Sequence, residues 1–123
     1  MNFDQAISAH VRWKGKLKEY LAKPNGSLSP AAVALDNKCD LGKWIAEEGA
    51  KHANLAEFQA VRSEHARFHK IAADIVHRAD SGQKLTEEVV LGSKSEFAGA
   101  SARVVNAIVA LKGKVEEHDL VTK

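Results

Sequence analysis

The chain has very little cysteine, with Cys39 as the only one among 123 residues. A single thiol cannot form an internal disulfide, so nothing points to the cross-linked scaffold of a small secreted protein. Residues 1–5 lack the basic start and apolar core of a signal peptide, and no apolar run approaches the roughly 20 residues needed to cross a bilayer. We therefore expect a cytoplasmic protein without membrane insertion.

An excess of one charge is also missing. The 18 Lys and Arg residues are nearly balanced by 16 Asp and Glu residues, which gives little attraction to nucleic acid or to an anionic membrane. Hydrophobic residues make up 45% and charged residues 28% of the chain, as in ordinary globular proteins. The length predicts a single domain, residues 1–123, with one core.

Prolines are scarce, and the two that occur mark helix boundaries. A first amphipathic helix, capped by Asp4, is predicted to end before residues 23–27, because the residue before proline leaves the helical region and Asn-Gly favours a turn. Ser29 as cap and Pro30 at the first helical position predict a short helix over about residues 30–35.

The remaining helices follow from apolar spacing. A second short helix is expected over residues 41–48 and ended by Gly49, and a long one from Asn54 to Asp80. Thr86 is predicted to cap the last helix. With no strand pattern or repeat, we expect an all-α fold, an antiparallel helical bundle of three long helices plus one or two short helices.

Three histidines occupy positions that apolar residues would otherwise fill. His65 and His69 lie four residues apart on one face of the long helix, and His10 lies in the apolar stripe of the first helix. Each buried polar group left unpaired would cost on the order of 1–3 kcal/mol, which a bound metal would remove. Cys39, just before a helix start that favours a thiolate, completes a four-ligand set. The alternative is three hydrogen-bonded histidines and a small core cysteine.

The ligand types select the ion. One thiolate and three neutral imidazoles suit tetrahedral Zn²⁺, whereas magnesium and calcium prefer oxygen. Copper and iron also accept imidazole, but the Glu-x-x-His pairs of di-iron carboxylate bundles are absent from the sequence. Because metal binding needs neutral histidines, we expect the affinity to fall as the pH drops through about 6.5.

Several of these residues also form a recognisable pattern. It comprises His10 with Trp13-Lys14, Cys39-Asp40-Leu41-Gly42-Lys43-Trp44, Phe58-Gln59, and His65-x3-His69 with Phe68. Over about residues 3–80 the chain resembles the bacterial chemoreceptor zinc-binding (CZB) domain family. The resemblance implies one zinc bound by His10, Cys39, His65 and His69 in a helical bundle that often dimerises. It also implies regulation of chemoreceptors in chemotaxis or of diguanylate cyclases, in response to zinc or to oxidants such as hypochlorous acid.

The other candidate residues have lesser roles. His52, His77 and His118 are expected on the solvated surface. Trp13 and Trp44 are expected in the core, where they can pack around the metal ligands. Asp36 and Asp40 are candidates for orienting a ligand histidine from the second coordination shell.

Four protein ligands would fill a tetrahedral zinc and leave no open position for substrate, so we expect no enzyme activity. A zinc-bound Cys39 thiolate is open to oxidation, which makes it a candidate redox switch that frees residues 41–48. A homodimer acting on signalling modules of the same or another chain is the expected assembly. Two alternatives are a purely structural zinc in a dimerisation or interaction module, and an iron- or haem-binding bundle.

Overall fold

The computed structural model describes residues 2–35, 39–82, 86 and 90–122, with side chains described as far as residue 115. All regular structure in these ranges is helical, which confirms the all-α prediction. The elements are α1 (Phe3–Val11), α2 (Trp13–Ala22), α3 (Pro30–Val33), α4 (Asp40–Ala46), the 3₁₀-helix η1 (Glu48–His52), α5 (Ala56–Asp80) and α7 (Glu96–Thr122).

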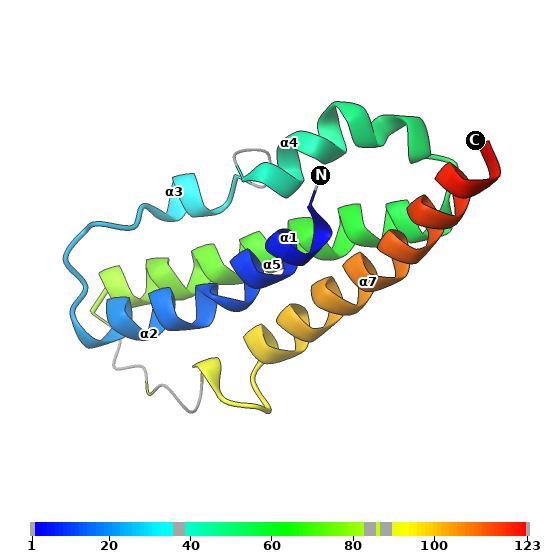
Figure 1. Ribbon diagram of the computed structural model, residues 1–123. Helices are drawn as coiled ribbons and strands as arrows, with labels where there is room; N and C mark the ends of the chain where they lie inside the picture. Colours follow the sequence, from blue (N-terminus) through cyan, green and yellow to red (C-terminus); the bar gives the residue numbers. More distant parts are fainter. Residues whose placement is uncertain (1, 36–38, 83–85, 87–89, 123) are drawn as a thin grey trace.

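The chain runs up and down along one bundle (Figure 1). Helices α1 and α2 lead in one direction, α3, α4 and η1 return, α5 repeats the first direction, and α7 runs back beside it. The most extensive packing is between α5 and α7, and both α2 and α3 also pack on α5. Helix α5 therefore positions α2, α3 and α7, whereas α1 packs mainly on α7.

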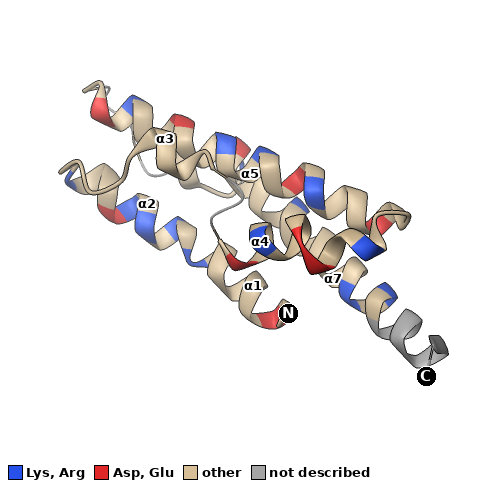
Figure 2. Ribbon diagram, turned by 90° about the horizontal axis from the view of Figure 1, so that it is seen from above, with Lys and Arg blue, Asp and Glu red and all other residues tan. Residues whose placement is uncertain are grey.

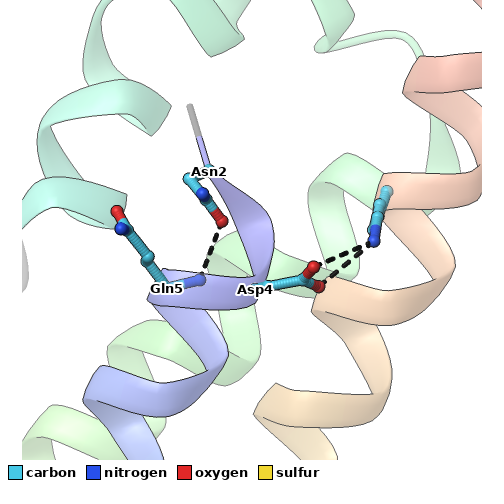
Figure 3. A network of polar contacts seen from close by, with 4 residues as sticks. Asn2, Asp4 and Gln5 are labelled. Carbon is cyan, nitrogen blue, oxygen red and sulfur yellow. Dashed lines mark hydrogen bonds and ion pairs between the residues drawn. The ribbon is translucent and has the colours of Figure 1, made fainter.

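The first predicted helix is divided into α1 and α2, with Arg12 between them. Asn2 rather than Asp4 caps α1, because the Asn2 side-chain oxygen accepts the N–H of Gln5 at 2.9 Å. Asp4 lies in the first turn and pairs instead with Lys112 of α7, with 3.1 Å between Nζ and Oδ1 (Figure 3). This ion pair joins α1 to the last helix.

The predicted turn after α2 is present, with Gly26 at a φ of +77°. The hydroxyl of Tyr20 donates to the carboxylate of Asp80 and accepts the N–H of Gly26 at 3.2 Å, so it ties the turn to the end of α5. Ser29 caps α3 as predicted, although this helix ends at Val33.

Helix α4 is shorter than predicted. It ends at Ala46, and Gly49 lies inside η1 instead of ending a helix. The ring of Trp44 lies so close to Gly49 that an added Cβ would be 2.8 Å from it. Glycine is therefore needed here to let the ring approach the backbone.

The last long helix starts later than predicted. Ser95 rather than Thr86 caps it, with the Ser95 hydroxyl accepting the N–H of Ala98 at 3.1 Å. The carbonyl of Thr86 accepts the N–H of Val90 at 3.2 Å, well before α7 begins.

The core lies between α5 and the helices packed on it. Phe68 of α5 and Phe97 of α7 meet with ring centroids 5.3 Å apart. The apolar residues of α7 in this core are Phe97, Val104, Ile108, Leu111 and Val115. Val11 of α1 lies outside this core and is 54% exposed.

Surface charges agree with the balanced composition. Figure 2 shows acidic and basic residues interspersed along α5. Among the described helices, none combines the length and apolarity needed to cross a bilayer.

Candidate metal centre

Four side chains from distant parts of the sequence meet against α5. His10 comes from α1, Cys39 from the N-cap position of α4, and His65 and His69 from α5. Each offers a ligand atom, and these four atoms all lie within 4.8 Å of one another. The structure thus brings together every residue of the predicted ligand set.

The spacing within this cluster fits a four-coordinate ion. The Cys39 Sγ atom lies 3.2 Å from Nε2 of His65 and 3.8 Å from Nε2 of His69, and these two nitrogens are 3.0 Å apart. Ligand atoms of a tetrahedral zinc, bound at about 2.0–2.3 Å, are separated from one another by about 3.3–3.8 Å. Small side-chain adjustments would therefore convert the observed cluster into a zinc coordination shell.

Backbone carbonyls orient two of the rings. Nδ1 of His10 lies 2.7 Å from the carbonyl oxygen of Ala6, and Nδ1 of His69 lies 2.9 Å from that of Val33. A carbonyl only accepts, so each Nδ1 carries the proton and each Nε2 keeps its lone pair for a metal. We had considered carboxylates for this role, but Asp40 is exposed and Asp36 lies outside the described residues.

One nitrogen of the cluster is buried without a partner. His10 Nε2 has no hydrogen bond to any described residue. Such an unsatisfied group costs on the order of 1–3 kcal/mol, and a cation at the centre of the cluster would remove this cost. One sulfur and three imidazole nitrogens are a donor set that zinc favours.

The histidines are held in the form that binds metal. His10, His65 and His69 are only 1–3% exposed. Burial, together with the nearby His69 and His10, lowers the pKa of His65 to about 3, and burial also lowers the pKa of His10. Both rings are therefore neutral at pH 7, which leaves their nitrogens free to act as ligands.

Cys39 differs from its neighbours because it is partly exposed. Burial raises the pKa of its thiol, and this effect exceeds the lowering by the backbone N–H groups of Gly42 and Leu41. The charge of Asp40 adds a further increase. The N–H groups at the helix start thus favour the thiolate as expected, but in the chain alone burial has the larger effect on the pKa. A cation bound to the sulfur would lower the pKa of the thiol and favour the thiolate.

Both tryptophans pack against the core but are only partly buried, and Trp13 is the one that contacts a residue of the cluster among the ring contacts described. Trp13 approaches His69 edge-on, with centroids 6.4 Å apart. Trp44 contacts Phe3 of α1 at 5.4 Å and Phe58 of α5 at 6.1 Å. Trp44 thereby fastens α4, and with it Cys39, to two other helices.

His52 is a residue whose surroundings we predicted wrongly. It is 3% exposed and stacks on Trp44, with centroids 6.1 Å apart and rings inclined by 26°. The short η1 carries it under the Trp44 ring, and a single 3₁₀ turn leaves no periodic apolar signal from which this burial is predictable. His77 is exposed as predicted, and the side chain of His118 is outside the described part of the structure.

Comparison with known proteins agrees with this geometry. The sequence model of the chemoreceptor zinc-binding domain family matches residues 10–76, which include all four residues of the cluster. No curated protein and no solved structure matched the chain. The family match covers more than half of the 123 residues. The chain, with three histidines and one cysteine gathered within metal-binding distance, therefore belongs to the chemoreceptor zinc-binding domain family.

Proposed function

We propose that this chain is a cytoplasmic regulatory domain of bacterial signalling in which His10, Cys39, His65 and His69 bind one Zn²⁺. The observation that carries the proposal is the meeting of four ligand atoms within 4.8 Å. The buried, unpartnered Nε2 of His10 and the family match support it further. The regulated partners would be chemoreceptor modules in chemotaxis or diguanylate cyclase modules, with the domain acting as a homodimer.

The role of the metal would be regulatory rather than catalytic. Three imidazoles and one thiolate complete a tetrahedral shell and leave no position for a reacting water or substrate. When bound, zinc would hold the Cys39 sulfur as an electron-rich thiolate. The chain's own contribution is to orient His10 and His69 through backbone carbonyls and to keep three ligands out of water.

Partial exposure makes Cys39 the ligand on which an oxidant would act. Hypochlorous acid would convert the thiolate to sulfenic acid and release chloride, so that sulfur loses two electrons and chlorine gains them. Loss of the thiolate would weaken zinc binding and release α4 from the three histidines. A changed surface or dimer interface would then be read by the signalling partner.

Two other functions predict different behaviour. A structural zinc would give one cooperative unfolding transition on metal removal, with no folded zinc-free state. A haem group is disfavoured because ligand atoms within 4.8 Å of one another leave no space for a porphyrin between them. Iron bound without haem would be seen in the visible absorption spectrum, since zinc is colourless.

Elemental analysis tests the metal and its ligands. We expect one zinc per chain in the wild type and in His77→Ala, which changes an exposed histidine of α5 outside the cluster. Cys39→Ala should lose its zinc to a chelator that leaves the wild type loaded. A wild-type protein that takes up no zinc, or a Cys39→Ala variant that keeps it equally well, would overturn the assignment.

Oxidant titration tests the sensor role separately. Zinc release, followed with a chromogenic chelator, should track the oxidation of Cys39 by hypochlorous acid. Helical circular dichroism should be largely retained and should recover after reduction and zinc addition. Unchanged zinc content after complete Cys39 oxidation would exclude the switch, and irreversible unfolding would favour the structural role.

A further inference from the structure

A surface hollow of about 490 Å³ between α1 and α4 leads to the cluster. Cys39 and His10 are part of its lining, and His10 Nε2 is the buried nitrogen that lacks a partner among the described residues. Asn2, Gln5 and Ala9 line it on the α1 side. The partly exposed Cys39 thus forms part of the lining of this hollow. We call it the α1–α4 hollow.

A second hollow reaches the cluster from another direction. It has a volume of about 410 Å³, and Ala53, Phe58 and Arg62 are among the residues around it. His65 is part of its lining, whereas Cys39 is not among the described residues that line it. The two hollows therefore lead to different ligands of the same cluster.

The α1–α4 hollow also has a negatively charged residue in its lining. Asp40 is the one residue of formal charge at neutral pH among the described residues that line it, beside the amides of Asn2 and Gln5. Figure 3 shows Asp4 pointing to α7, whereas Gln5 points to the opposite side of α1. A negative charge next to the thiol disfavours the approach of anions to the sulfur.

We propose that the α1–α4 hollow is the route by which reagents reach the Cys39 sulfur, and that it admits small uncharged or cationic reagents in preference to anions. This inference rests on the proposed function where the physiological reagent is an oxidant. The selectivity would then favour neutral hypochlorous acid over anionic hypochlorite. The route itself is a property of the thiol and its surroundings, whether or not zinc is bound.

Labelling with methanethiosulfonates tests the charge selectivity in the protein as purified. The Cys39 thiolate attacks the sulfenyl sulfur, a disulfide forms, the bond from that sulfur to the sulfonyl group breaks, and methanesulfinate leaves. Because Cys39 is the only cysteine, mass spectrometry reports on this site alone. Neutral, cationic and anionic reagents of similar size are compared, each relative to its rate with a small free thiol.

The anionic reagent should be slower than the neutral one by about fivefold, as expected for one nearby charge in a partly aqueous setting. Asp40→Asn should reduce this ratio towards one. The ratio between reagents is the measured quantity because the substitution also changes the pKa of Cys39, which affects all reagents alike. A ratio unchanged by Asp40→Asn would overturn the charge selectivity.

Filling each hollow in turn tests the route. Ala9→Phe should slow labelling of Cys39 by the neutral reagent severalfold, whereas Ala53→Phe, in the second hollow, should not. Ala9→Leu provides a smaller obstruction if the first variant folds poorly, as judged by circular dichroism. Equal slowing by Ala9 and Ala53 substitutions, or none by either Ala9 variant, would overturn the route.

The same variants separate this inference from the zinc proposal. In a zinc-loaded protein, Ala9→Phe should slow zinc release by hypochlorous acid without changing equilibrium zinc affinity. A chain that binds no zinc would refute the proposed function, while the labelling rates would still decide whether the hollow leads to Cys39.

Discussion

The Nδ1 atom of His69 lies 2.9 Å from the carbonyl oxygen of Val33. This bond joins the metal cluster to α3, a four-residue helix positioned by the Ser29 cap and by Pro30 at its start. Zinc binding through Nε2 would require the His69 ring to carry its proton on Nδ1. A backbone carbonyl of a separate short helix thus fixes the tautomer of His69. The stability of α3 should therefore influence the cluster.

Ser29→Ala should lower both stability and zinc affinity. The substitution removes the hydroxyl that accepts the N–H of Ala32 at 3.4 Å, which costs about 0.5–2 kcal/mol for a typical N-cap. Urea denaturation measures the loss, and competition with a chelator measures the affinity. Ser29→Asp, which restores a capping acceptor, should recover most of both. A loss of stability without any change in zinc affinity would show that α3 does not influence the cluster.

Gly49→Ala should lower the stability of the protein, unlike a typical glycine-to-alanine substitution in a helix. The new Cβ would meet both the ring and the carbonyl oxygen of Trp44 at 2.8 Å, and overpacking of this kind costs about 1–3 kcal/mol. Because Trp44 fastens α4, the displacement should also make zinc easier to remove. Thermal unfolding and chelator competition measure the two effects.

Gly15→Ala in α2 is the matched control. Apart from its chain neighbours and the backbone of α2, no described atom lies within 4 Å of its added Cβ, so this variant should gain about 0.5–1 kcal/mol from the better helix propensity of alanine. If the two glycine variants behaved alike, Trp44 would not be pressed against Gly49.

Phe68→Ala should destabilise the bundle by about 3–5 kcal/mol, as for other buried aromatic truncations. The Phe68 ring is fully buried, and its centroid lies 5.3 Å from that of His10 and 5.8 Å from that of His69. Removing it opens a cavity beside two ligands, so zinc affinity should fall as well. Phe68→Leu, which keeps most of the volume, should show smaller losses. Chemical denaturation with and without zinc measures both the stability and the zinc affinity. An unchanged affinity would show that Phe68 does not support the cluster.

The zinc-free protein should lose stability as the solution becomes acidic. The pKa of His65 is lowered from 6.5 to about 3, and that of His10 is lowered as well. Between pH 6.5 and about 3, the unfolded chain binds more protons than the folded one, so stability decreases as the pH falls through this window. Urea midpoints of chelator-treated protein across this range test the sign. A midpoint independent of pH would contradict the burial of these rings.

Zinc affinity should respond mainly to Cys39 near neutral pH. We first expected affinity to fall as the histidines protonate near pH 6.5, but the low pKa of His65 moves its competition with protons to more acidic solutions. Burial raises the pKa of Cys39, so zinc must displace its proton at pH 7 and affinity should rise with pH. Calorimetry in buffers of different ionisation enthalpy should find about one proton released per zinc bound. Uptake of zinc without proton release would show that the thiol is already ionised.

Helix type and the four residues of the cluster were predictable from local patterns and the family motif. The apolar spacing of α5 predicts both its length and the inward direction of His65 and His69, because residues four apart share a helix face. Ser29 and Pro30 predict the start of α3, since their preference for helix starts is a short-range property. The choice of His10 and Cys39 came from an unusual residue in an apolar stripe and from the CZB motif.

Only the tertiary structure decided how these residues are supported. The acceptors for His10 and His69 are carbonyls of Ala6 and Val33, and every residue carries a carbonyl, so composition cannot identify them. The burial of His52 depends on the ring of Trp44 turning back over η1, a contact between separate turns with no periodic signature. The opening to Cys39 likewise exists only because α1 and α4 come side by side. The amino-acid order determined the helices and the donor atoms, whereas packing between helices determined their orientation, protonation and access to solvent.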